Sequence, residues 1–179
     1  VYEHIQCLML AHNLVPKEKK NALLKLFFTK QMRTIELSAL RWLIDAMMKN
    51  GSEARRFLMT ELRSIFEPIV YAGATSLWET RLGSDDFGGA GSLCHGWSSV
   101  MPYFCGRYLL GIEPLDEGFK RFLVKPYCAD LTHVSGEVPT PFGVIRVSWR
   151  KDGNSLNIRV EHPEGTIPVS GEYEEYNYL

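Results

Sequence analysis

The sequence predicts an α+β protein in which a helical part is followed directly by an antiparallel β part. Up to about residue 112, apolar residues recur three or four positions apart, which is the spacing of one helix face. From Glu117 onward apolar and polar residues alternate, which is the pattern of strands with one buried face. The chain has 179 residues, of which 45% are apolar, so a core can form. We therefore expect two domains, 1–113 and 114–179.

Five helices are expected in the first part, and their short connections favour antiparallel hairpins. The expected ranges are 1–14, 17–28, 36–49, 52–66 and 98–110. Pro16 suits the start of the second helix because its fixed backbone angle is already helical. Asn50-Gly51 is a typical stop for the third helix. Ser52 is a candidate cap for the fourth helix, which is expected to end before Pro68.

Four strands are expected in the second part, and their alternation predicts a half-exposed antiparallel β-sandwich. The expected ranges are 119–124, 131–138, 144–149 and 156–160. Turn residues at 151–154 predict a hairpin between the last two strands, and 139–143 predicts another turn. The acidic and aromatic segment 172–179 is expected to fray.

The composition argues against several classes of function. The net charge is −1 and the pI is about 6.6, with no basic patch of the kind that binds nucleic acid. No apolar run reaches the ~20 residues that a membrane span needs. The four cysteines fit no zinc spacing, and we expect them to be small buried residues. We expect no nucleic-acid or membrane partner, no metal and no cofactor.

The segment 73–97 contains the residues that point to a function. Its candidates are Trp78, Glu79, Asp85, Asp86, His95 and Trp97. Indole faces stack on the apolar faces of sugar rings, and charged groups hydrogen-bond sugar hydroxyls. Glycines throughout the segment let the backbone approach a ligand closely. The combination predicts a carbohydrate site.

Each candidate also has a purely structural interpretation. Glu79 can be a solvated acid in a turn that starts a helix, and Trp78 can be a core indole. Asp86 can hold the loop through local turns, and His95 can be a satisfied structural group. Cys94 lies next to His95, but adjacent side chains on a helix or strand point apart, which disfavours a nucleophilic pair.

Three motifs follow one another in the middle of the chain. They are Gly73-Ala74-Thr75-Ser76-Leu77-Trp78-Glu79-Thr80, Gly91-Ser92-Leu93-Cys94-His95-Gly96-Trp97-Ser98, and Gly111-Ile112-Glu113-Pro114 with Gly118-Phe119-Lys120-Arg121-Phe122. Together they resemble the catalytic end of the α-L-rhamnosidases, family 78-like members of the six-hairpin glycosidases. The resemblance covers nearly the whole chain and is sharpest from about 72 to 126. Cys94 replaces an Asn found in many members, which bears on fine specificity more than on reaction class.

The resemblance implies a fold, and it implies that the catalytic groups are shared between this chain and another part of the barrel. Residues 1–113 would be the C-terminal part of an (α/α)6 barrel, and 114–179 would be the small β-sandwich that follows it. The partners would be an L-rhamnose-containing glycoside and the N-terminal remainder of the barrel. The general acid would lie in that remainder, so the isolated chain is expected to be inactive. Export or a periplasmic location is suggested by the resemblance alone.

The resemblance also implies a mechanism, inverting hydrolysis of terminal α-L-rhamnosides. Glu79 matches the general base of the family, and His95 matches a substrate-binding histidine. Trp97, Trp78 and Asp86 complete the expected sugar pocket.

Other functions stay open. The chain can be a non-catalytic carbohydrate-binding or assembly fragment that keeps Glu79, His95 and Trp97 as a half-site, or a fragment without independent function. It can also belong to a six-hairpin glycosidase for another sugar, because a fold does not settle its substrate.

Overall fold

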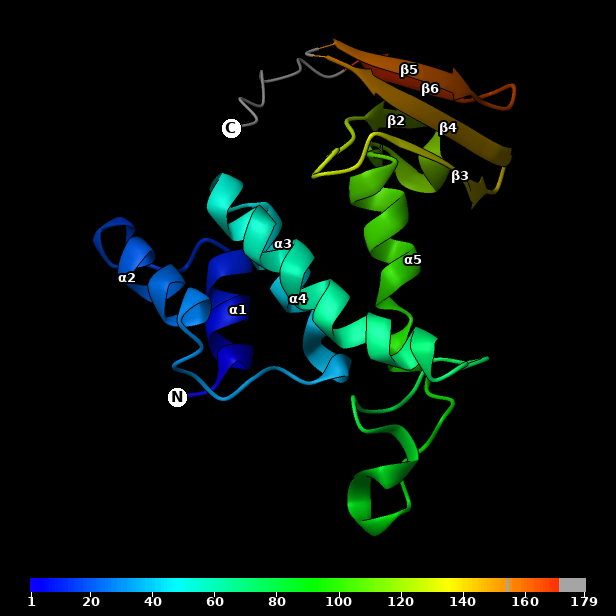
Figure 1. The fold of residues 1–179 in the computed structure, drawn as a ribbon. Helices are drawn as coiled ribbons and strands as arrows, with labels where there is room; N and C mark the ends of the chain where they lie inside the picture. Colours follow the sequence, from blue (N-terminus) through cyan, green and yellow to red (C-terminus); the bar gives the residue numbers. More distant parts are fainter. Residues whose placement is uncertain (154, 171–179) are drawn as a thin grey trace. The chain divides into compact units, whose positions relative to one another are not determined.

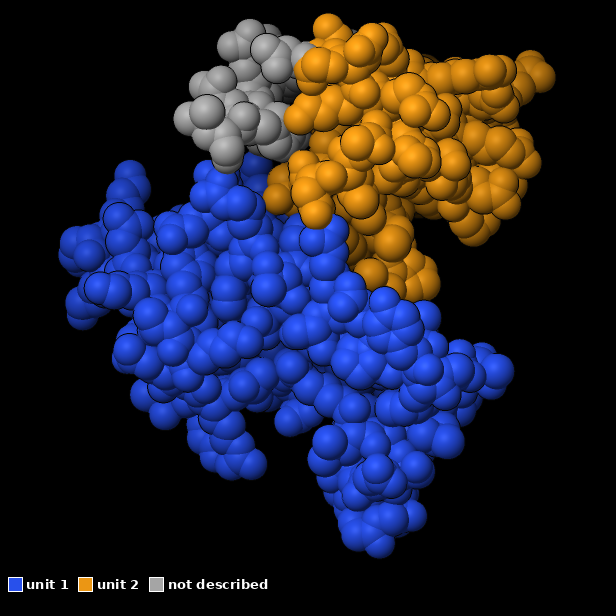
Figure 2. Space-filling view, viewed as in Figure 1, with its two compact units in different colours: residues 1–100 blue, residues 101–179 orange. Residues whose placement is uncertain are grey.

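The computed structural model describes residues 1–153 and 155–170 and contains both helices and sheets (Figure 1). The α+β class predicted from the sequence is confirmed. The chain divides into two compact units, Val1–Val100 and Met101–Leu179, which Figure 2 colours separately. The domain boundary expected after residue 113 stays a prediction. Asn154 of the expected hairpin turn and the segment 172–179 lie outside the described residues.

Four α-helices form most of the first unit. They are α1 (Glu3–Ala11), α2 (Lys17–Phe28), α3 (Leu40–Met48) and α4 (Gly51–Tyr71), with a 3-10 turn η1 (Leu37–Ala39) before α3. Helix α3 contacts both α1 and α4. Its apolar face is fully buried at Leu40, Ile44 and Met47, which recur at helical spacing. The range expected for α2 from Pro16 onward is confirmed.

Helix α4 differs from the sequence prediction at both ends. It begins at Gly51, so the N-cap position is that of Asn50, whose side chain makes no capping hydrogen bond, and Ser52 is not the cap. The helix also continues through Pro68 to Tyr71, although a proline interrupts the hydrogen bonding of a helix. Ile65 and Ile69 are both buried on one face, so packing holds the last turn in place.

The segment between α4 and the next helix carries the candidate site. In Figure 1 it is the irregular green stretch after α4, with two short 3-10 turns, η2 (Gly83–Gly88) and η3 (Gly96–Ser98). Arg81 ties this segment to the helical core, because its Nη2 donates to the backbone oxygen of Ile35 at 2.9 Å.

The second unit begins with a helix that changes type along its length. Helix α5 (Val100–Phe104) continues as a π-helical turn, η4 (Cys105–Leu109). Gly111 then turns the chain with a φ of +75°, and a Cβ there would lie 2.2 Å from the Lys125 carbonyl carbon. Only glycine fits this close approach of two backbones. No helix among the described residues is long and apolar enough to cross a membrane.

Among the described residues of the second unit, six strands form two three-stranded sheets (Figure 1). They are β1 (Ile112–Pro114), β2 (Arg121–Val124), β3 (His133–Thr140), β4 (Gly143–Asp152), β5 (Ser155–Glu161) and β6 (Ile167–Ser170). The sheet β3-β4-β5 is antiparallel throughout, with the hairpin predicted between β4 and β5 and a second hairpin, between β3 and β4, at the turn predicted for 139–143. In the other sheet β6 runs parallel to β2, whereas the sequence pattern predicted only antiparallel pairing.

One apolar core joins the two sheets. Its fully buried side chains include Phe122 from β2 and Ile145 and Val147 from β4. Trp149 of β4 is also buried, and its Nε1 donates to the backbone oxygen of Leu109 at 2.7 Å. This bond gives the buried indole N–H the partner that it requires.

Candidate functional site

Backbone hydrogen bonds bring the first two motifs together. The amide of Glu79 donates to the oxygen of Ser92 at 2.9 Å, and the amide of His95 donates to the oxygen of Leu77 at 2.7 Å. Ser76 Oγ adds a bond to the oxygen of Leu93 at 2.5 Å. Residues 76–79 and 92–95 therefore lie side by side, as a single site built from two motifs requires.

The carboxylate of Glu79 is half-buried and held on one side only. Its Oε2 accepts from the amide of Ser92 at 3.2 Å. Its Oε1 makes no hydrogen bond within the described part of the chain. A carboxylate that is oriented by one oxygen and open at the other can accept a proton from a water molecule.

The side chains of His95 and Trp97 form a stacked pair. Their ring centroids lie 3.8 Å apart and their planes differ by 20°. The Trp97 amide donates to His95 Nδ1 at 3.5 Å, so Nδ1 is the acceptor and Nε2 is the ring nitrogen left to carry a proton. That N–H is then available to a ligand. Trp97 is 48% exposed, and its Nε1 donates to the backbone oxygen of Glu79 at 3.1 Å.

Trp78 packs against the loop that follows it. Its half-buried ring lies over Gly83, where a Cβ would come within 2.6 Å of a ring carbon. Ser98 Oγ donates to the Trp78 backbone oxygen at 2.5 Å. This packing supports the structural interpretation of Trp78, while its contact with sugar stays a prediction.

Asp86 organises the glycine-rich loop. Its Oδ1 accepts from the amide of Phe87 at 2.8 Å, and its backbone oxygen accepts from the amides of Gly89, Ala90 and Gly91. These bonds are those of a residue that holds turns. Binding of a sugar hydroxyl by Asp86 stays a prediction, and the neighbouring Asp85 is exposed.

Sequence reasoning missed the serines that fasten the site. Hydrogen bonds between the first and the second motif are made by three serines, Ser76, Ser92 and Ser98. These serines belong to the same motifs as the candidate residues. Their position on both sides of Glu79 and His95 was the available signal. Directly after Glu79, Thr80 Oγ1 and Arg81 Nε are buried without a hydrogen-bond partner within the described residues.

The cysteines do not all behave as expected. Cys7 and Cys128 are buried, but Cys94 is exposed. The expectation of a small buried residue is therefore wrong for Cys94, because its loop lies at the surface of the first unit. Among the described residues, no group of three His, Cys, Asp or Glu side chains is placed to hold a metal ion.

Comparison with known proteins identifies the family likeness. Residues 111–168 match the family model described as bacterial alpha-L-rhamnosidase C-terminal domain. The chain resembles the α-L-rhamnosidases. The resemblance expected from the three motifs is thus confirmed. A search of curated proteins gives no significant match.

Solved rhamnosidase structures share the fold of this rhamnosidase-like chain. A GH78 family rhamnosidase of Bacillus sp. GL1 is 22% identical with a TM-score of 0.83, over 97% of this chain and 19% of that one. An α-L-rhamnosidase from Dictyoglumus thermophilum is 20% identical with a TM-score of 0.77, over 95% and 20%. A Streptomyces avermitilis α-L-rhamnosidase in complex with L-rhamnose is 18% identical with a TM-score of 0.72, over 92% and 17%. This chain therefore spans about a fifth of the length of these structures.

Proposed function

We propose that this chain supplies the general base and part of the sugar pocket of an inverting glycoside hydrolase that acts on terminal α-L-rhamnosides. Glu79 takes a proton from a water molecule, which attacks the anomeric carbon as the glycosidic oxygen leaves. An acid on the other side of the ring protonates the leaving oxygen. His95 and Trp97 bind the sugar, with Trp78 and Asp86 holding the loop around it.

One observation carries the proposal. The Glu79 carboxylate is oriented through Oε2 by the Ser92 amide, while Oε1 has no hydrogen bond within the described residues. The stacked His95 and Trp97 are tied to the same residue through the Glu79 backbone oxygen. A base, a hydrogen-bond donor and an exposed indole therefore occur together, which suits a sugar ring.

The rest of the proposal concerns parts beyond these residues. We propose that the helices of the first unit are part of an (α/α)6 barrel and that the two sheets are its C-terminal β-sandwich. The general acid then comes from outside residues 1–179, and the isolated chain does not turn over rhamnosides. The fold likeness to rhamnosidases several times longer than this chain supports that division.

The test uses the natural-length protein and an aryl α-L-rhamnoside. We expect Glu79→Gln to reduce kcat by at least ~10²-fold, as for removal of a general base. Proton NMR of the first product should show the β anomer, because an inverting enzyme turns an α-linked sugar into a β product.

Asp85→Asn is the matched control. It removes a carboxylate from the same segment, but Asp85 is exposed and outside the proposed chemistry, so its kcat should stay near the wild-type value. Equal losses in both variants, or an α anomer as first product, would contradict the proposal. Activity on a different sugar and none on rhamnosides would favour another glycosidase of this barrel type.

A further inference from the structure

The outward face of the sheet β3-β4-β5 is polar, in contrast to its inward face. The strand register places three rows of side chains on it: His133 with Arg150 and Asn157, Ser135 with Ser148 and Arg159, and Glu137 with Arg146 and Glu161. The alternate residues Val147 and Trp149 point inward to the core. The outward face therefore takes no part in the core between the two sheets.

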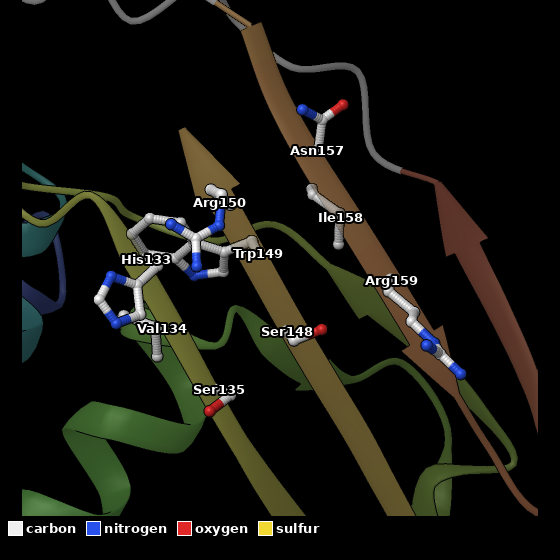
Figure 3. Close-up of a pocket in the computed structure, with 9 residues that line it drawn as sticks. All are labelled: His133, Val134, Ser135, Ser148, Trp149, Arg150, Asn157, Ile158 and Arg159. Atoms are coloured by element: carbon white, nitrogen blue, oxygen red, sulfur yellow. The ribbon is translucent and has the colours of Figure 1, made fainter. Parts of the chain in front are cut away.

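The middle row forms a trough across the three strands. Hollows of about 350 and 410 Å³ lie on either side of it, and both are lined by Ser135, Ser148 and Arg159. Figure 3 shows the first of them, on the side of His133 and Arg150. The two serines are short, whereas Arg150 on one side and Arg146 on the other are long. The trough thus follows from side-chain length at successive outward positions of β4.

The charges along the trough are unequal. In the second hollow, Arg146 pairs with Glu137 at 3.2 Å and Arg159 pairs with Glu161 at 2.8 Å. The first hollow is lined by His133, Arg150 and Arg159 and by no carboxylate. Within the described residues Arg150 makes no ion pair. As far as the structure describes the chain, the His133 end of the trough therefore has a cation without a counterion.

We propose that this trough, called here the sheet trough, binds an acidic saccharide through the carboxylates of its uronic acid units. Arg150 presents the planar fork of donors that matches a carboxylate. Ser135, Ser148 and Asn157 supply the hydroxyl and amide groups that pair with sugar hydroxyls. The trough is open and crosses several strands, which suits a sugar chain held along its length. This site is separate from the Glu79 segment and makes no use of its chemistry.

Calorimetry on the natural-length protein tests the sheet trough with three probes. An oligogalacturonide should bind, with an affinity that falls as salt is raised. A neutral oligosaccharide of equal length and inorganic phosphate should each bind much more weakly. Equal affinity for the neutral sugar would contradict the requirement for acid groups. Equal affinity for phosphate would contradict the proposal that the ligand is a saccharide. Absence of oligogalacturonide binding would overturn the whole proposal.

Two variants locate the binding. Arg150→Gln should weaken oligogalacturonide binding about tenfold, as expected for loss of a charge-assisted bond. Ser148→Tyr should weaken it as well, because a ring fills the trough while every arginine stays, and tyrosine suits a strand. Circular dichroism checks that both variants are folded.

Arg56→Gln is the matched control, since Arg56 is an exposed arginine on α4 in the other unit. It should leave the affinity unchanged. An equal loss in this variant would mean diffuse attraction to positive charge and would overturn the assignment to the sheet trough. These readouts measure binding and not hydrolysis, so they are independent of the role proposed for Glu79.

Discussion

The indole of Trp97 stacks on the imidazole of His95 at 3.8 Å and donates its Nε1–H to the backbone oxygen of Glu79. One side chain of the second motif thus connects the predicted sugar-binding histidine to the predicted base. The glycine-rich loop separates the two motifs in the sequence. The hydrogen bond of this indole is one of the contacts that hold the two ends of the loop together.

Trp97→Phe should separate the two roles of this indole. Phenylalanine keeps a ring to stack on His95 but loses the hydrogen bond to Glu79. We expect the free energy of unfolding to fall by about 0.5–1 kcal/mol, at the low end for a hydrogen bond because the site is exposed. Urea unfolding of both proteins measures it, and a stability equal to the wild type would show that the bond contributes nothing.

Gly91→Ala should disrupt the loop at the start of the second motif. A Cβ on Gly91 would lie 1.9 Å from the backbone oxygen of Gly83. Because the clashing atom belongs to the backbone, the clash can be relieved only by a movement of the loop. We expect Ser92 to shift away from Glu79, with faster hydrogen exchange at the Glu79 amide that donates to Ser92. In the natural-length protein, rhamnoside hydrolysis should fall with it.

Gly96→Ala is the control for that substitution. Gly96 lies in the same segment, but nothing approaches a Cβ there within 4 Å. Its stability should stay within about 0.5 kcal/mol of the wild type, as for an unconstrained surface change. Comparable loss of protection in the two variants would refute the steric explanation.

The buried carboxyl of Glu3 should make stability depend on pH. Desolvation raises its pKa above the ordinary value of 4.5, and nearby Glu61 adds to the rise. Two kinds of interaction lower the Glu3 pKa and so oppose this rise. One is the hydrogen bond that the Ile35 amide donates to the carboxylate, and the other is the electrostatic interaction with Arg81 and His4. Since the folded-state pKa is the higher one, the folded protein binds the proton more tightly. The stabilisation by protonation is complete below about pH 4.5 and is lost as the pH rises through the raised pKa.

Glu3→Gln should remove this dependence. Glutamine keeps an oxygen for the Ile35 amide but has no charge to desolvate. Relative to wild type, the variant should therefore gain stability between pH 4 and pH 7, measured by urea unfolding at unit steps. Glu36→Gln, at an exposed position, should show no such gain. A constant difference between Glu3→Gln and wild type across that range would contradict the assignment.

Trp149→Phe should destabilise the second unit. The buried indole N–H is the hydrogen-bond donor to the oxygen of Leu109, and phenylalanine would leave that oxygen without it. We expect a loss of about 1–3 kcal/mol, the range for a buried group deprived of its partner. Urea unfolding followed by far-UV circular dichroism measures it. Phe142→Leu, at an exposed turn position, should change stability far less.

The sequence predicted elements well where local signals agreed. Pro16 and a clear apolar stripe located α2, and the turn residues located both hairpins of the sheet β3-β4-β5. Where packing overrides a local signal, the sequence was misleading. Pro68 suggested the end of a helix, but the buried Ile69 keeps the helix going. The π-helical turn over Cys105–Leu109 adds a residue to the helix without any local signal.

The candidate site was predicted in part for a similar reason. Residues of recognisable chemistry, such as Glu79 and His95, are visible in a motif, whereas the backbone bonds that hold them depend on how two segments pair. The hydrogen bond from Arg81 to the backbone oxygen of Ile35, which anchors the segment, joins residues far apart in the chain. Such long-range contacts have no periodicity that a local pattern could display.

The parallel pairing of β6 with β2 has a consequence for biosynthesis. The strand Arg121–Val124 must wait for Ile167–Ser170 to emerge from the ribosome before its second edge is covered. Contacts this distant along the chain form slowly, because a long loop must close first. During translation this edge of β2 is exposed to other nascent chains until β6 pairs with it, and among the described residues β6 then forms the edge of the sheet in place of β2.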